Sequence, residues 1–332
     1  MMSWKNTLYD YVLNKNESSV ECTAMDLPLF IADESYIARE QARRLGEAAI
    51  SRERSLRPNN GETKLRIHDV RSIRDSVTVE VSMYQVKQYM QSRADYSEEK
   101  LERERISFRF FDGRWRITAI EHINTEQSLK QPMPLERQSS PSLPFFNYSI
   151  LKKVNESPHR QQQLYNRSRV VEYADRWWNS YNPAYWEFEV DCTNFASQCI
   201  FAGSAPMIYT GKRGLGWWYV GMEHQQELWS FSWAVANALK NYSISSTSGF
   251  RGYLVDSPQQ LELGDMIAYD WDGDGRYQHN AIVTMKDDNG MPLMNAHTNN
   301  SKHRYWSYRD SYAWTPNTRY AFIHINDEMT MP

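Results

Sequence analysis

A proline-rich segment in the middle of the chain constrains the fold most strongly, because it separates the sequence into two halves. Residues 126–163 hold five of the 13 prolines: Pro132, Pro134, Pro141, Pro144 and Pro158. Segments rich in proline and polar residues stay extended and rarely join a core. The length of 332 residues is enough for two ordinary domains. We therefore predict a domain over 1–125, a linker over 126–163 and a second domain over 164–326.

The charge balance and the apolar content exclude several classes of protein. The 38 Lys and Arg residues and 41 Asp and Glu residues give a net charge of −3, which produces no general attraction to nucleic acid. No stretch approaches the roughly 18 apolar residues that a membrane helix needs, and residues 1–21 carry no secretory signal pattern. Three cysteines are too few for a disulfide framework and favour a reducing compartment. We expect no nucleic-acid partner, no membrane span and a cytoplasmic location.

The N-terminal half predicts a small α+β domain. Residues 34–51 carry apolar side chains at helical spacing, and residues 77–82 alternate apolar and polar side chains as a half-buried strand does. Asp112-Gly113 separates two further alternating runs and predicts a hairpin, because both turn residues must accept a positive φ. This order of elements resembles a cystatin-like or nuclear-transport-factor-like cone. The half contains no catalytic constellation, so its role stays open.

The C-terminal half predicts helices first and an antiparallel sheet after them, which is an α+β arrangement. Helices are expected from about residue 170 to near Asn182-Pro183, over 191–202 and over 228–242, and Gly203 stops the second of them. Strands are expected over 266–271, 279–285, 293–297, 303–308 and 320–325.

The segment Asp191-Cys192-Thr193-Asn194 is the most informative part of the sequence. Asp191 is a good N-cap residue, which places Cys192 in the first turn of a helix. Unpaired backbone amides at a helix start favour an anion, so a cysteine there can become a thiolate nucleophile. The alternative interpretation is that Cys192 is a small buried hydrophobic residue. Cys199 lies seven residues further on and is expected to pack in the core.

A thiolate nucleophile needs a base and a group that orients the base. His279 begins one predicted strand, and His297 ends the next strand after the turn Asn289-Gly290. Since the start of one strand of an antiparallel hairpin faces the end of the other, we expect the two histidines to form a pair. Asn295 and Asn299 share the face of His297 by strand alternation, so either is an alternative third residue.

Several motifs occur together in a specific order, and this order resembles the putative amidase domain family of Gram-positive bacteria. The resemblance covers about residues 165–325 and rests on Tyr165-Asn166-Arg167, Tyr181-Asn182-Pro183, Asp191 to Phe195 with Ser197-Gln198, Ser230 to Trp233, Gly264-Asp265, Asp270 to Gly275, His279 and Ala296-His297-Thr298. That family is similar to the papain-like cysteine peptidases and amidases, near the CHAP and NlpC-type cell-wall hydrolases.

The resemblance implies a papain-like C-terminal domain with Cys192 as nucleophile and His279 as base. We carry the third position onto His297, which would orient His279. Tyr181 is a possible match for the oxyanion-region tyrosine of the NlpC-type enzymes. The expected reaction is hydrolysis of a peptide or cell-wall-type amide through a thioester, with the Cys192 amide helping to hold the oxyanion. It requires no metal or organic cofactor.

Two other classes of function remain open. One is a module that binds peptide or glycan on a papain-like scaffold without turnover, and the other is an assembly protein in which the N-terminal domain is the working part. The run Asp270-x-Asp272-x-Asp274-Gly275 is similar to the first half of a calcium loop, but position twelve is Ala281 rather than glutamate. A turn stabilised by aspartate side chains is the expected interpretation.

Overall fold

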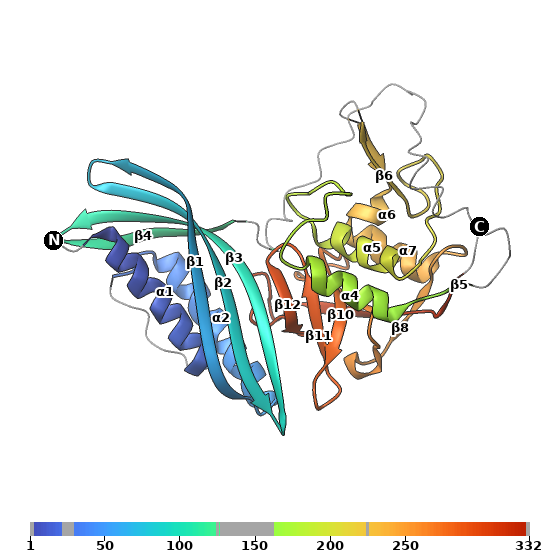
Figure 1. Cartoon of the computed structure of the whole chain (residues 1–332), viewed down its shortest axis with the longest axis horizontal. Helices are drawn as coiled ribbons and strands as arrows, with labels where there is room; N and C mark the ends of the chain where they lie inside the picture. Colours follow the sequence, from blue (N-terminus) through green and yellow to red (C-terminus); the bar gives the residue numbers. More distant parts are fainter. Residues whose placement is uncertain (1–2, 22–29, 124–125, 127–162, 224–225, 330–332) are drawn as a thin grey trace. The chain divides into compact units, whose positions relative to one another are not determined.

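The structure, a computed structural model, describes residues 3–21, 30–123, 126, 163–223 and 226–329 and divides into two units (Figure 1). The N-terminal unit comprises residues 1–125 together with 287–289 and 299–314. The C-terminal unit comprises 126–286, 290–298 and 315–332. Two pieces of the predicted domain 164–326 therefore belong to the N-terminal unit. Most of the predicted linker 126–163 lies outside the described residues.

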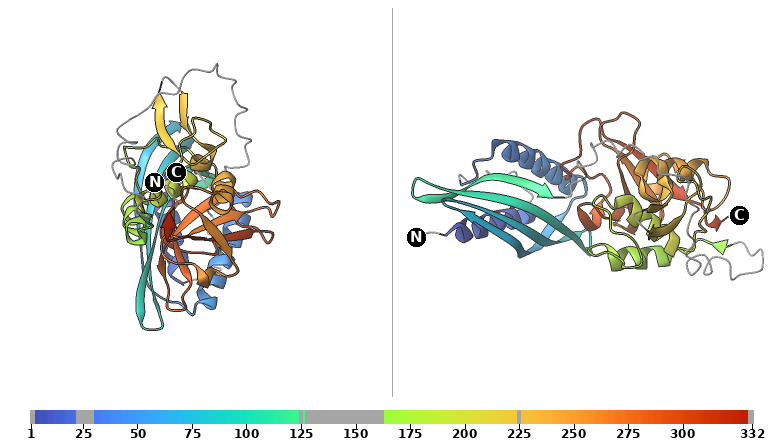
Figure 2. Two further views of the ribbon diagram at one scale, coloured as in Figure 1. Left: turned by 90° about the vertical axis from the view of Figure 1, so that its right-hand side faces the viewer. Right: turned by 90° about the horizontal axis from the view of Figure 1, so that it is seen from above.

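The N-terminal unit is an antiparallel sheet with two helices on one of its faces (Figures 1 and 2). Strand β2 lies between β1 and β3, and β4 and β12 pair with different parts of β3. Its elements are α1 (Trp4–Glu21), α2 (Glu34–Glu53), β1 (Arg57–Ile73), β2 (Ser76–Gln91), β3 (Ala94–Phe111), β4 (Arg114–Ile123) and β12 (Asn300–Tyr305). Apolar side chains of both helices and of β2, β3 and β4 form the core.

The predicted hairpin between β3 and β4 is confirmed. Asp112 and Gly113 both have a positive φ, 50° and 74°, as a two-residue hairpin turn of this type requires. The predicted helix over 34–51 is α2, and Asp33 caps it by accepting a hydrogen bond from the Tyr36 amide.

Residues 299–314 complete the N-terminal unit from far along the sequence. The Asp310 carboxylate accepts hydrogen bonds from Lys100 on β3 and from Arg304, and all three side chains are almost fully buried. Tyr312 donates a hydrogen bond of 2.6 Å to Glu40 on α2. The carbonyl oxygen of Arg309 lies directly against Gly46, where an added Cβ would be only 2.0 Å away.

Gly46→Ala is expected to destabilise the N-terminal unit by roughly 1–3 kcal/mol, because the new methyl group meets backbone that cannot move away easily. Intrinsic helix propensity alone predicts the opposite, a gain of about 1 kcal/mol. Urea unfolding measures the difference. Gln41→Ala, at an exposed position of the same helix, is the control and should change stability little. A Gly46→Ala protein more stable than wild type would show that residues 299–314 do not pack on α2.

The C-terminal unit is also an α+β structure. Its main sheet is antiparallel with strand order β11-β10-β9-β13-β8, and helices α4, α5 and α7 contact its strands. Its helices are α4 (Arg167–Trp177), α5 (Cys192–Ala202), α6 (Phe231–Ala234) and α7 (Ala236–Ser245), with a 3-10 helix over Pro258–Gln260. The sheet strands are β8 (Gly252–Val255), β9 (Met266–Asp270), β10 (His279–Lys286), β11 (Pro292–Ala296) and β13 (Arg319–Ile325).

Three predicted elements of the C-terminal half differ from the structure. The first helix, α4, ends at Trp177 and not near Asn182-Pro183. Residues 228–242 are not one helix, because Val235 has extended backbone angles and separates α6 from α7. The preceding residues form β7 (Gln226–Trp229), which pairs with β6 (Tyr219–Glu223), while β5 (Gln163–Leu164) pairs with β14 (Glu328–Met329). The strand expected over 303–308 is instead β12, over 300–305, in the N-terminal unit. Among the described residues no helix has the length and apolar character to span a membrane.

Candidate active site

Cys192 is the first residue of α5, as the sequence predicts. Its side chain is buried, and the sulfur lies 3.7 Å from the Thr193 hydroxyl oxygen and 4.0 Å from the carbonyl oxygen of Gln278. Gln278 directly precedes β10, so the thiol lies against the start of that strand. Cys199 is buried within the same helix, in line with its expected role in the core.

Asp191 occupies the N-cap position, but its side chain does not cap the helix. One carboxylate oxygen accepts hydrogen bonds from the Phe188 amide and from the side-chain amide of Asn194. The other lies 2.6 Å from Nδ1 of His297. The expectation that Asp191 faces the helix amides is therefore wrong, because a buried histidine competes for the carboxylate.

Thr298 caps α5 in place of Asp191. Its hydroxyl oxygen accepts hydrogen bonds from the Asp191 amide at 2.8 Å and from the Cys192 amide at 3.1 Å. A side-chain cap of this kind contributes on the order of 1 kcal/mol to stability. The Cys192 amide, which is expected to help hold the oxyanion, therefore already has an acceptor in this structure.

Both ring nitrogens of His297 contact groups other than His279. Nδ1 faces Asp191 and Nε2 lies 2.7 Å from the carbonyl oxygen of Trp177. Both partners are acceptors, so the ring satisfies both only when both nitrogens carry a proton. The ring also stacks on Phe195 of α5 with 4.1 Å between centroids, and Tyr181 approaches it edge-on at 5.0 Å.

The predicted pairing of His297 with His279 does not occur. Ile282 lies opposite Asn295 in the ladder between β10 and β11, so two residues further along both strands Asn280 and His297 share one face. His279 points to the other face. There its ring centroid is 5.4 Å from that of Tyr269, the residue on β9 with which it pairs. His279 is fully buried.

Asn280 is a site residue that sequence reasoning missed. Its side-chain amide donates a hydrogen bond of 3.2 Å to the Thr193 hydroxyl, next to the nucleophile candidate. The side chain is fully buried, and within the described part of the chain its Oδ1 has no hydrogen-bond partner. Buried polar atoms without a partner are rare, and each calls for an explanation. The alternation of β10 places Asn280 on the α5 side, but its register is visible only in the structure.

The two asparagines considered as third residues have different positions. The Asn295 side chain accepts a hydrogen bond from Thr284 and donates one to Asp175 of α4, both at 2.8 Å. Asn299 has a positive φ of 79° and begins the segment that belongs to the N-terminal unit. Neither pairs with His279 in an interaction that the structure shows.

The Asp270 carboxylate organises the turn after β9. Its two oxygens accept hydrogen bonds from the amides of Gly273, Asp274 and Gly275. This is the turn stabilised by an aspartate side chain that the sequence predicts. No group of three His, Cys, Asp or Glu side chains within the described residues is arranged to hold a metal ion.

The electrostatic surroundings keep the Cys192 thiol neutral. Burial raises the pKa of Cys192 to about 11, and the nearby Asp191 carboxylate acts in the same direction. The Asn280 backbone amide and the Thr193 hydroxyl lower the pKa but do not outweigh burial. The structure therefore holds a protonated thiol at neutral pH.

Alkylation of Cys192 by iodoacetamide is expected to be slow at neutral pH and to accelerate about tenfold per pH unit, because only the thiolate reacts. Because the pKa of Cys192 is raised to about 11, the alkylation rate should keep increasing until the pH approaches that value. Mass spectrometry of the peptide that contains Cys192 measures the rate. A plateau reached below pH 8 would contradict the environment described here.

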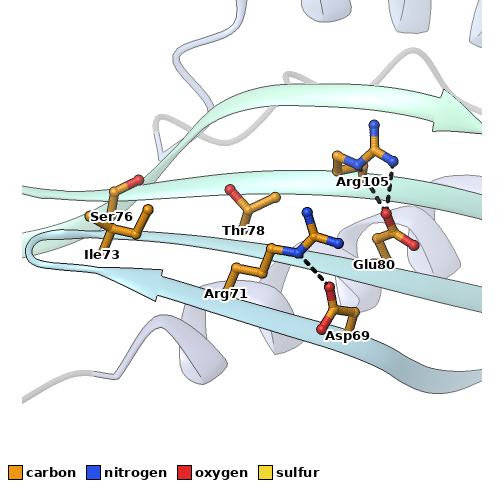
Figure 3. A pocket seen from close by; sticks show the side chains of 7 residues that line it. All are labelled: Asp69, Arg71, Ile73, Ser76, Thr78, Glu80 and Arg105. Atoms are coloured by element: carbon orange, nitrogen blue, oxygen red, sulfur yellow. Dashed lines mark hydrogen bonds and ion pairs between the residues drawn. The ribbon is translucent and has the colours of Figure 1, made fainter.

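A shallow cavity of about 180 Å³ lies on β1, β2 and β3 of the N-terminal unit (Figure 3). Its charged side chains pair with each other: Arg71 with Asp69 and Arg105 with Glu80, each at 2.7 Å. The remaining lining residues are Ile73, Ser76 and Thr78. No cysteine or histidine lines this cavity, so it offers no chemistry like that around Cys192.

Comparison with known proteins finds a family model and a curated relative that resemble this chain. Residues 164–323 match a family model described as "Putative amidase domain". The chain is also 44% identical over 208 residues to the "Uncharacterized protein YhbB" of Bacillus subtilis (strain 168). This similarity covers 63% of the chain and 64% of the relative, so less than two thirds of that protein's length is matched. No solved structure matches the chain significantly.

Proposed function

We propose that the C-terminal unit, whose residues 164–323 match the model of the putative amidase domain family, hydrolyses amides through Cys192. The observation that carries the proposal is the position of Cys192 at the start of α5, with its sulfur against the strand that His279 begins. Helix-start cysteines beside a histidine are recurrent nucleophiles. A papain-like architecture of this unit is part of the same proposal.

In the proposed reaction His279 accepts the thiol proton, and the Cys192 sulfur attacks the amide carbonyl carbon. The C–N bond breaks, and the amine leaves with the proton from His279. Water then cleaves the thioester, which releases the acid and restores the thiol. For the first step the backbone at the start of β10 must rearrange so that the His279 imidazole reaches the sulfur, since in this structure the ring lies against Tyr269 and the sulfur lies against the Gln278 carbonyl oxygen.

His297 has a different role in this proposal from the one the sequence suggested. Through its contact with Asp191 it fixes the residue immediately before the nucleophile. His297 is therefore a positioning residue for the start of α5. Tyr181, whose ring packs edge-on against it, supports the same ring.

Capture of the thioester tests the proposal. The full chain is incubated with peptide p-nitroanilides or soluble muropeptides, quenched in acid and digested, and the acyl group is located by mass spectrometry. We expect the acyl mass on the peptide that contains Cys192 and none on the peptide that contains Cys199. Product release without acylation of Cys192 would contradict the cysteine mechanism.

The alternative function is a non-catalytic module that binds peptide or glycan. The buried thiol and its raised pKa favour this reading, because both oppose nucleophilic attack. Binding of muropeptides without acylation and without product release would support it over the hydrolase.

A further inference from the structure

The Thr298 hydroxyl already binds the backbone amides at the start of α5. It accepts hydrogen bonds from the amides of Asp191 and Cys192 at 2.8 and 3.1 Å. In the proposed reaction the Cys192 amide would instead donate to the carbonyl oxygen of the bound acyl group. One N–H group donates well to only one acceptor at short distance, so the two oxygens compete for the same donor.

The backbone at this point is strained. Thr298 has a φ of 60° and Asn299 a φ of 79°. A β-branched residue with positive φ is a genuine outlier, and such strain persists only where the surroundings enforce it. Release of Thr298 would relieve this strain and so reduce the cost of breaking its two hydrogen bonds.

The nucleophile candidate is covered in the same state. The Cys192 side chain is 1% exposed and Thr298 is 3% exposed. His297, next to Thr298 in the chain, contacts the Asp191 carboxylate. Two consecutive residues, His297 and Thr298, therefore bind the two residues at the start of α5. The Cys192 amide already has an acceptor and the thiol is buried, so the site is in a state without bound substrate.

We propose that the Thr298 hydroxyl is an internal latch, which occupies the Asp191 and Cys192 amides at rest and leaves them when an acyl group binds Cys192. This inference rests on the proposed role of Cys192 as nucleophile. Removal of the hydroxyl leaves both amides at the helix start free to stabilise a thiolate, because unpaired N–H groups there favour an anion. The latch therefore suppresses the reactivity of the thiol.

Two variants separate the hydroxyl from the rest of the side chain. Thr298→Val keeps the shape and the β-branch but loses the acceptor, and Thr298→Ser keeps the acceptor. The rate of alkylation by iodoacetamide at pH 7.5 is measured separately at Cys192 and Cys199 by peptide mass spectrometry on the full chain. We expect Thr298→Val to react at Cys192 about tenfold faster than wild type, which corresponds to the loss of one or two ordinary hydrogen bonds. Thr298→Ser should stay within about twofold of wild type, since its hydroxyl can accept the same hydrogen bonds.

Cys199 is the internal control for loss of structure. It is fully buried seven residues further along α5, so it reacts only if the helix opens. Equal rates at Cys192 in Thr298→Val and wild type would overturn the latch, and so would a parallel rise at Cys199. The readout needs no turnover. Faster alkylation in a protein that forms no thioester would keep the latch and reject the hydrolase, and thioester formation with unchanged alkylation would do the reverse.

Discussion

Cys192→Ala is expected to abolish amide hydrolysis, with a loss of roughly 10³-fold or more, because the proposed thioester forms on the Cys192 sulfur. The thiol is the only covalent reactant that the proposed mechanism takes from the protein. Alanine fits the volume of the buried site at the helix start, so the fold should be retained. Release of amine from a muropeptide or peptide amide measures the loss, and thermal unfolding checks the fold.

Cys199→Ala is the matched control for this experiment. Both cysteines are buried in α5, and both substitutions remove one sulfur atom. Only Cys192 lies at the helix start beside β10, so Cys199→Ala should keep activity within a few-fold. If Cys192→Ala retained more than a tenth of the wild-type rate, the assignment of the nucleophile would be wrong.

Lys15→Met is expected to destabilise the N-terminal unit by about 3–5 kcal/mol, the usual cost of removing one partner from a buried ion pair. The Lys15 ammonium lies 2.9 Å from Glu102 and 2.7 Å from Glu104, and all three side chains are nearly inaccessible. Tyr11 donates a further hydrogen bond to Glu104. Without the lysine, two carboxylates on β3 lose the cation that they share in the interior.

The pKa values in this cluster give the sign of its pH dependence. Burial alone raises the pKa of Glu102, but Lys15, Arg43 and His122 together outweigh it and lower the pKa from 4.5 to about 2. A carboxyl whose pKa is lowered by folding stabilises the fold above its unfolded pKa. This contribution is therefore present above about pH 4.5 and is lost as the pH falls toward 2.

Lys64→Met supplies the comparison for Lys15→Met. Lys64 also pairs with a glutamate, Glu62, but the two side chains are 65% and 57% exposed. Exposed pairs contribute about 0–1 kcal/mol, so this variant should unfold almost as wild type does. Urea denaturation of both variants gives the two values. A Lys15→Met protein within about 1 kcal/mol of wild type would show that the buried cluster is not needed for stability.

The position of the candidate nucleophile was predictable, but its partners were not. Asp191 before an apolar run is a local signal, and α5 does begin at Cys192. Whether that carboxylate caps the helix or binds a histidine depends on residue 297, over 100 positions away in the sequence. Local sequence contains no information on which of the two contacts is formed.

The pairing of the two histidines failed for a specific geometric reason. Next to the turn, Met285 lies opposite Leu293, and continuation of that register would put His279 and His297 on one face. A bulge between Val283 and Met285 shifts the pairing by one residue. A shift of one residue exchanges the faces of every later side chain in a strand. Nothing in the sequence of β10 signals this bulge.

Helix α1 and strand β1 of the N-terminal unit could not be predicted either, because their local sequence patterns are weak. Helix α1 buries Leu8 and Tyr11, but it also buries Thr7, Lys15 and Ser18, so its apolar periodicity is weak. Strand β1 is largely exposed along its length and therefore lacks an alternating pattern. By contrast α2 and the Asp112-Gly113 hairpin carry strong local signals and form as predicted.

The contribution of residues 299–314 to the N-terminal unit has a consequence for biosynthesis. Lys100 and its partner Asp310 are 210 residues apart in the sequence, so the edge of β3 that β12 covers stays open during most of translation. Contacts between such distant residues form slowly, and an open strand edge is prone to pair with other chains. The unit made first is thus among the last to finish folding, and a chain that terminates before residue 314 has an incomplete N-terminal unit.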